Sequence, residues 1–140
     1  MKRLENSRRY PISIIFADVD DLKMINDTLG HLQGDAVLHQ AVALLGRCFR
    51  TEDLVARVGG DEFAVILPET DEEGVREARE RVQATINAQQ ADPAALHFTL
   101  SLGAATAQKG EFLRSALILA DQQMYLKKKD RHSANDETSM

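Results

Sequence analysis

Two acidic side chains stand beside two glycines in the segment ARVGGDEFAVIL, residues 56–67. Gly59 and Gly60 are typical of a two-residue turn between strands, because glycine adopts a positive φ without steric cost. They also leave a surface without side chains, where a phosphate or ribose can approach the backbone. A turn does not account for Asp61 and Glu62, which stand where an apolar strand begins. Carboxylates are ligands that Mg²⁺ prefers, often shared with substrate phosphates, so the segment predicts either a solvated turn or part of a metal site.

A third carboxylate that could complete this site follows the apolar run ISIIFA at 12–17. Such a short, almost continuously apolar run indicates a strand covered on both faces. Asp18 comes directly after it, and active residues of α/β sheets gather at strand ends. We expect Asp18 to lie close to the two hairpin carboxylates if the hairpin packs beside this strand. Two metal ions about 3.5–4 Å apart would then permit in-line phosphoryl chemistry.

The acids that follow Asp18 have a simpler interpretation. Asp20 or Asp21 could cap the next helix, since Asp is favoured at N-caps. Capping and metal binding are compatible, because different carboxylates can serve each role.

Charge and composition exclude several classes of protein. A formal net charge of -5 argues against a general nucleic-acid binder, which needs a basic face. The same charge would repel a polyphosphate substrate unless a cation mediates. No apolar run approaches the roughly 20 residues of a bilayer span. The basic start MKRLENSRRY has no signal-peptide pattern. The single cysteine, Cys48, is typical of a buried core thiol. We therefore expect a cytoplasmic domain, which is compatible with a membrane tether elsewhere in the full-length protein.

The hydrophobic pattern predicts a single α/β domain of order β-α-α-β-β-α-β-α. Helices that alternate with an antiparallel hairpin indicate an α/β (α+β) sandwich on one mixed sheet, of ferredoxin-like type. A domain at 1–132 and a disordered tail at 133–140 are expected. The predicted elements are a strand at 12–17, a short helix ending before Gly30, a helix at 34–49, strands at 54–58 and 63–67, a helix at 75–86, a strand at 96–102 and a helix at about 111–128.

Three motifs together resemble the GGDEF domain of diguanylate cyclases. They are DVDDLKMINDTLGHLQGD at 18–35, RVGGDEF at 57–63 and SLGAA at 101–105, in the family's order and spacing. The resemblance implies a palm-like α/β fold and the condensation of two GTP into cyclic di-GMP, with release of two pyrophosphates. It also implies a homodimer in which each half-site holds one GTP and two Mg²⁺ (or Mn²⁺) ions.

The resemblance also assigns the metal site. Asp18, Asp61 and Glu62 match the family's metal carboxylates, and Val19 would add its backbone carbonyl. Asp61 is in addition implicated as the catalytic base that takes the proton of the 3′-hydroxyl.

The nucleotide contacts implied by the family lie mostly in the first motif. Asp35 also has a rationale of its own, because a carboxylate can accept both N1–H and N2–H of guanine, whereas adenine offers no such pair. Leaving that carboxylate unpaired would disfavour the wrong base by about 1–3 kcal/mol. Its other interpretation is an acid favoured by the dipole of the next helix. The matching residues are Lys23 and Lys128 for phosphate, Asn26 and Asp35 for guanine, and His31 beside the substrate.

A product-inhibition site is implied by the segment FRTEDLVARVGG. Arg50 and Asp53 match the family's RxxD pair, in which the arginine stacks on guanine and grips phosphate while the aspartate reads the guanine edge. Arg81 aligns with a further arginine of that site. Without the resemblance, a mixed-charge helix end is the usual explanation of this spacing.

Two departures from the family pattern stand out. His132, preceded by Arg131, stands where the family has a basic phosphate contact, and it would be largely neutral at pH 7. The segment LKKKDRH could also be a solvated helix end, which is the interpretation we give to Lys127 and Lys129. The start of the chain lacks the family's usual opening helix and any sensory module, so we expect an N-terminally truncated catalytic domain.

Two alternatives to a cyclase stay open. One is a non-catalytic GGDEF domain that binds cyclic di-GMP or GTP as a regulatory module, which the intact signature disfavours. The other is a palm-like nucleotidyl cyclase or transferase for another base, which Asp35 disfavours.

Overall fold

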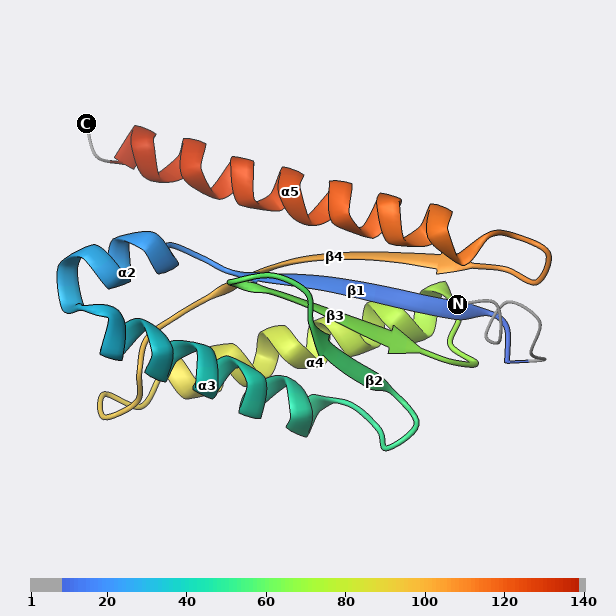
Figure 1. Cartoon of the computed structure of the whole chain (residues 1–140), viewed down its shortest axis with the longest axis horizontal. Coiled ribbons are helices and arrows are strands. Elements are labelled where there is room, and N and C mark those ends of the chain that lie inside the picture. Colours follow the sequence, from blue (N-terminus) through green and yellow to red (C-terminus); the bar gives the residue numbers. More distant parts are fainter. Residues whose placement is uncertain (1–8, 139–140) are drawn as a thin grey trace.

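The computed structural model describes residues 9–138, with side chains up to residue 130. It confirms the predicted order of helices and strands (Figure 1). The elements are β1 (Ile12–Val19), α2 (Leu22–Leu29), α3 (His31–Cys48), β2 (Leu54–Arg57), β3 (Glu62–Leu67), α4 (Glu72–Gln90), β4 (Leu100–Ala107) and α5 (Leu113–Thr138).

The four strands form one sheet in the order β2-β3-β1-β4, and every neighbouring pair is antiparallel. The fold class is therefore confirmed, but the prediction of a mixed sheet is wrong. Helical connections do join strands of the same direction, β1 to β2 and β3 to β4. An antiparallel strand lies between the members of each pair, so no two parallel strands are neighbours.

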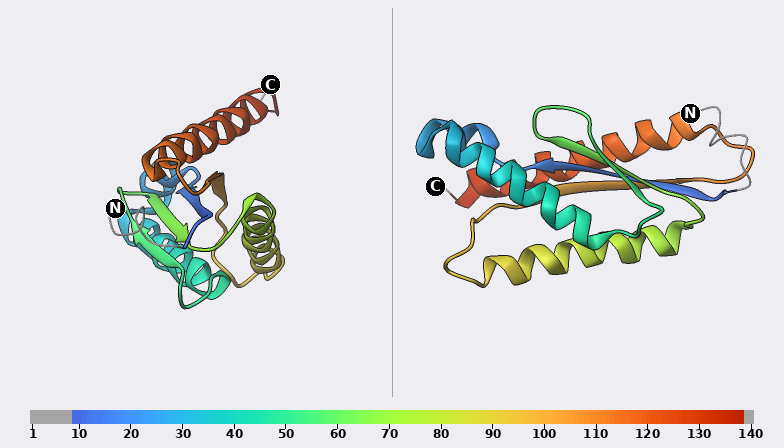
Figure 2. Two further views of the ribbon diagram at one scale, coloured as in Figure 1. Left: turned by 90° about the vertical axis from the view of Figure 1, so that its right-hand side faces the viewer. Right: turned by 60° about the horizontal axis from the view of Figure 1, so that its bottom comes forward.

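Helices cover both faces of the sheet (Figures 1 and 2). One face packs on α3 and α4 in the larger core, to which β1 contributes Ile15, Ala17 and Val19. The other face packs on α5 through a smaller core that includes Ile12 and Ile14. Because side chains alternate along a strand, Asp18 follows Ile12 and Ile14 on the face that α5 covers.

The last strand begins later than predicted, at Leu100 instead of residue 96. The alternation at 96–102 misled the prediction, because β4 is covered on both faces and most of its residues are buried. Close packing of α5 requires small residues here. A Cβ on Gly103 would meet the backbone of Ala120 and Met124.

The last helix extends beyond its predicted end at residue 128 and reaches Thr138. It therefore includes most of the segment predicted as a disordered tail. No proline or glycine follows residue 128 to stop the helix. The domain boundary at 132 stays a prediction, and residues 139–140 lie outside the described part of the chain.

Candidate active site

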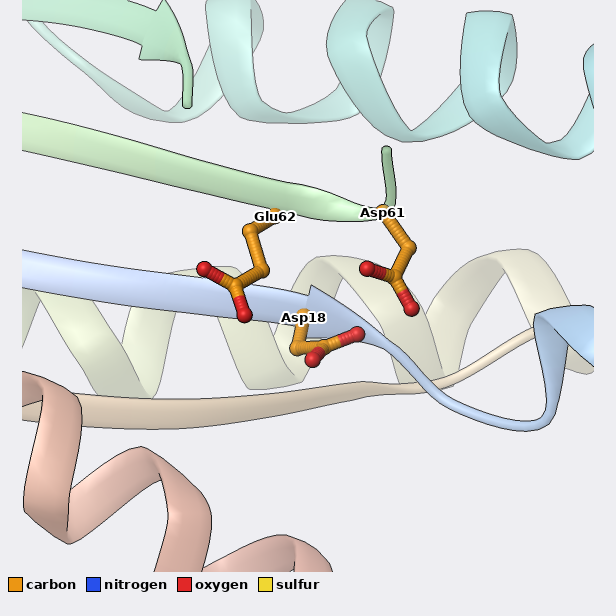
Figure 3. Close-up of side chains that lie close together, drawn as sticks. All are labelled: Asp18, Asp61 and Glu62. Atoms are coloured by element: carbon orange, nitrogen blue, oxygen red, sulfur yellow. The ribbon is translucent and has the colours of Figure 1, made fainter. Parts of the chain in front are cut away.

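Three carboxylates, from β1, from the start of β3 and from the hairpin loop before it, converge at one end of the sheet (Figure 3). Asp18 of β1 lies directly opposite Glu62 of β3 in the strand register. The Val19 N–H donates to the carbonyl of Asp61 at 2.9 Å, which holds the start of β3 against the end of β1. One ligand oxygen from each of Asp18, Asp61 and Glu62 lies within 4.8 Å of the others. The predicted convergence is confirmed, and the metal role of these residues, with the Val19 carbonyl, stays a prediction.

Asp18 is the buried member of this cluster, with 4% of its surface exposed. Its Oδ2 accepts a hydrogen bond from Lys128 Nζ at 3.0 Å, and its Oδ1 has no hydrogen-bond partner among the described residues. Burial raises the pKa of Asp18 to about 6, because the hydrogen bond from Lys128 only partly offsets the cost of desolvation. A buried carboxylate oxygen without a partner needs an explanation, and a divalent cation would supply one.

Lys128 supplies the positive charge of this cluster from α5. Its Nζ also lies 3.9 Å from Asp61 Oδ2, so it faces two of the three carboxylates. Burial lowers the pKa of Lys128, but the hydrogen bond to Asp18 and the nearby acids outweigh that effect and leave the pKa raised. The lysine therefore stays charged near neutral pH.

Two hollows open onto the carboxylates. The larger, of about 770 Å³, lies between the carboxylates and α5 and is also lined by Tyr125 and Lys128. The smaller, of about 400 Å³, is lined by Lys23, Asp61 and Lys128. The larger volume falls within the range of small-molecule sites, and the phosphate role of Lys23 stays a prediction.

The hairpin that presents Asp61 differs from the predicted two-residue turn. The loop also includes Val58 and Asp61, and neither Gly59 nor Gly60 adopts a left-handed φ. This longer connection needs no left-handed residue. Arg57 holds it, since its Nε donates to the Gly59 carbonyl at 3.1 Å and its Nη2 to the Gly60 carbonyl at 2.6 Å. A Cβ on Gly60 would meet nothing within 4 Å, so the surface there is open.

The predicted guanine contacts lie at the elbow between α2 and α3. The chain turns at Gly30, whose φ is 93°. Asn26 is half-buried, and its side chain lies where a Cβ of Gly34 would be, so it packs directly on the backbone of α3 beside the exposed Asp35. His31 is exposed at the first residue of α3. The structure thus packs Asn26 against the residue that precedes Asp35, while their roles and that of His31 stay predictions.

Neither Asp20 nor Asp21 caps α2 through its side chain, so the capping prediction is wrong for both. Asp21 occupies the N-cap position of α2, but it has a φ of 59° and makes no side-chain capping bond. Asp20 is buried and faces β4, where it accepts hydrogen bonds from Thr99 Oγ1 and Ser101 Oγ, each at 2.6 Å. Sequence reasoning missed this contact. Its signal was two hydroxyl residues spaced two apart at the start of an apolar strand.

Two of the three predicted inhibition residues, Arg50 and Arg81, line a different hollow of about 370 Å³, and Asp53 contacts Arg50. The Asp53 carboxylate accepts from the Arg50 backbone N–H at 2.9 Å and its side chain is fully enclosed. Arg50 Nη2 donates to Thr70 Oγ1 at 3.0 Å. Arg81 Nε donates to the Cys48 carbonyl at 2.8 Å, at the end of α3. The three residues are thus brought near one hollow, and a ligand for it stays a prediction.

The fold and the three carboxylates together define the class of this protein, a palm-like α/β domain with a candidate site for a divalent cation. A palm-like antiparallel α/β domain carries oxygen ligands suited to a divalent cation at the end of its central strand, with lysines and an open hairpin beside them. Oxygen-rich sites of this kind bind Mg²⁺ together with substrate phosphates.

Comparison with known proteins gives the family. The model of the diguanylate cyclase GGDEF domain matches residues 1–134, and the chain belongs to this family. It is 33% identical over 127 residues to the probable diguanylate cyclase DgcT of Escherichia coli, covering 86% of this chain and 28% of that protein. It is 31% identical over 126 residues to diguanylate cyclase A of Treponema denticola, covering 88% of this chain and 34% of that protein. The chain thus spans about a third of the length of these relatives.

Solved structures agree with this assignment. The GGDEF domain of YfiN from Pseudomonas aeruginosa superposes with a TM-score of 0.78 at 34% identity, covering 91% of this chain and 82% of that one. The GGDEF domain of DgcB from Caulobacter crescentus, determined in complex with c-di-GMP, gives a TM-score of 0.75 at 29% identity, covering 85% of this chain and 72% of that one.

Within residues 9–138, none of the helices has both the length and the apolar character of a membrane span.

The side chains of Arg131 and His132 lie outside the described residues, so a phosphate contact from either stays a prediction.

Proposed function

We propose that this chain is the catalytic domain of a diguanylate cyclase, which joins two GTP molecules into cyclic di-GMP and releases two pyrophosphates. The observation that carries this proposal is the convergence of Asp18, Asp61 and Glu62, with one buried oxygen of Asp18 that has no hydrogen-bond partner among the described residues. Membership of the GGDEF family supports the choice of substrate. A domain in the cytoplasm, where GTP is available, fits the absence of a bilayer-spanning helix among the described residues.

Asp18, Asp61 and Glu62 would hold two Mg²⁺ or Mn²⁺ ions with the Val19 carbonyl. When bound, these ions neutralise phosphate charge and stabilise the oxygens that attack and leave. Asp61, at the open hairpin, takes the proton from the attacking 3′-hydroxyl. Lys23 and Lys128 would orient the phosphates, because both line the same hollow as Asp61.

The elbow between α2 and α3 would read the base. Asp35 is exposed and accepts from N1–H and N2–H of guanine, and Asn26, packed on the neighbouring Gly34, would add a contact from its side-chain amide. His31 is exposed at the first residue of α3, in the same elbow. Each protomer holds one GTP, so a homodimer is needed to bring each 3′-hydroxyl in line with the partner's phosphate.

Product inhibition would act through the second hollow. Arg50 is half-exposed at its side chain, and its guanidinium can stack on a guanine once it leaves Asp53. The side chain of Arg81 would supply a further cation to the same ligand.

The direct test is product formation. The chain, dimerised by a fused coiled coil, is incubated with GTP and Mg²⁺, and cyclic di-GMP is measured by chromatography. We expect turnover in the wild type, loss of at least about 100-fold in Asp61→Ala, and no loss in Glu73→Ala, which changes an exposed acid on α4. No product from the wild type, or equal product from Asp61→Ala, would refute the mechanism.

The second candidate, a regulatory module that binds cyclic di-GMP without turnover, is favoured only by the separate hollow at Arg50. Calorimetric titration distinguishes the two. Product binding that Arg50→Ala abolishes, in a chain that does not turn over GTP, would support the module.

A further inference from the structure

We propose that Asp20 is a positioning residue of the active site, because its hydrogen bonds to Thr99 and Ser101 fix the connection between Asp18 and helix α2. The proposal rests on the proposed function. It assigns to Asp20 no contact with metal or substrate. It predicts that the distance between the metal carboxylates and helix α2 depends on a contact with the neighbouring strand β4.

The contacts of Asp20 tie it firmly to the start of β4. Asp20 has 4% of its surface exposed and Ser101 has 5%. Thr99 Oγ1 donates to one carboxylate oxygen and Ser101 Oγ to the other, both at 2.6 Å. The Asp20 N–H donates to the Thr99 carbonyl at 2.9 Å. Hydroxyl-to-carboxylate bonds of this length are among the stronger hydrogen bonds in proteins.

Asp20 stands between Asp18 and helix α2 in the chain, so its contacts affect the placement of both. Two residues before it stands Asp18, and three residues after it Lys23 faces the hollow that Asp61 lines. Between them Asp21 has a left-handed backbone with a φ of 59°, which residues other than glycine seldom adopt and which persists only where the surroundings enforce it. Anchoring Asp20 enforces this turn and thereby sets where α2 begins.

The geometry argues against a ligand role for Asp20. Both of its oxygens are occupied by hydroxyl donors on the side of β4. Within the part of the chain described, the carboxylates grouped closely enough to share a cation are Asp18, Asp61 and Glu62, without Asp20. Its role is therefore to hold the backbone in place.

The first test compares two substitutions of the same residue in the dimerised chain. Asp20→Ala removes both bonds, and a misplacement of about 1 Å in a catalytic group can cost about 100-fold in rate, so we expect kcat to fall by about that factor. Asp20→Asn keeps the shape and can accept from one hydroxyl while donating to the other, so we expect activity within about threefold of wild type. In contrast, Asp18→Asn should lose activity as fully as Asp18→Ala, because that carboxylate must bind cations.

The second test does not depend on turnover. Mn²⁺ binding is measured by electron paramagnetic resonance, with thermal unfolding recorded in parallel. We expect Asp20→Ala to bind Mn²⁺ about tenfold more weakly, as is usual when support of a metal ligand is lost, and Asp20→Asn to bind it nearly as wild type does. Should Asp20→Ala fail to fold, Ser101→Ala removes one bond and should show a smaller loss in the same direction.

Two results would overturn the inference. In the first, Asp20→Asn is as damaging as Asp20→Ala, which would mean that the charge itself is required. In the second, Asp20→Ala lowers the melting temperature while Mn²⁺ affinity and kcat of the folded protein are unchanged, which would mean a purely structural role. If the wild type makes no cyclic di-GMP, the proposed function fails, and the Mn²⁺ series still decides the role of Asp20.

Discussion

Replacing Gly34 by alanine should weaken guanine binding without unfolding the protein. Gly34 is buried in α3, and a Cβ there would overlap the side-chain amide of Asn26 on α2. The neighbour in the way is the end of a flexible side chain, so Asn26 can rotate away while both helices stay in place. The displaced amide would no longer lie against the backbone of α3 next to Asp35.

The expected magnitudes distinguish the effect of Gly34→Ala on stability from its effect on GTP binding. Alanine in place of glycine inside a helix gains about 1 kcal/mol, and forcing Asn26 out of its preferred rotamer costs about the same, so the free energy of unfolding should change little. Loss of one hydrogen bond from Asn26 to the base costs about 1 kcal/mol in binding. That cost corresponds to about a fivefold weaker affinity for GTP.

The assay is calorimetric titration with a non-hydrolysable GTP analogue in the presence of Mg²⁺. The matched control is Gly46→Ala, an exposed glycine of the same helix whose added Cβ would meet nothing within 4 Å. We expect Gly46→Ala to bind GTP as the wild type does. Because Gly34→Ala acts through Asn26, the double variant with Asn26→Ala should bind no worse than Asn26→Ala alone. Equal affinity in the two glycine variants, or additive losses in the double variant, would refute this reasoning.

Three further predictions concern the cluster and the packing of α5. Because burial raises the folded-state pKa of Asp18 from 3.8 to about 6, the contribution of Asp18 to stability in the presence of a chelator should be greatest below pH 3.8 and should fall by up to about 3 kcal/mol as the pH rises through 6. Thermal unfolding across this range checks it, and a fall that persists in Asp18→Asn would contradict it. Lys128→Met should weaken GTP binding about tenfold, because a charged hydrogen bond to phosphate is lost, whereas Lys127→Met, at an exposed position, should bind normally in the same titration. Gly103→Ala should lower the free energy of unfolding by about 2 kcal/mol, because its Cβ would meet the backbone of α5. Urea unfolding measures this loss, and a variant as stable as Gly46→Ala would show that α5 can move aside.

The sequence predicted most elements and the convergence of the site, and its errors have identifiable physical causes. Period-two alternation marks strands with one face in water, so it placed β4 at 96–102 although the strand at 100–107 is buried on both faces. Asp20 was assigned to capping because propensity describes only neighbours in sequence. Its partners Thr99 and Ser101 lie some eighty residues away and become neighbours only through the pairing of β1 with β4.

The antiparallel sheet explains why the site is assembled from such distant segments. The general rule used for the prediction concerns strands whose carboxyl ends meet at one edge of a parallel sheet. Here the end of the inner strand β1 lies beside the starts of both neighbours, so Asp18 pairs with Glu62 on one side and with Ser101 on the other. The β3 side supplies the remaining carboxylates, and the β4 side supplies the hydroxyls that hold Asp20. One strand end thus joins the candidate metal ligands to their support, and a substitution on β4 should affect a metal site whose carboxylates come only from β1 and the hairpin.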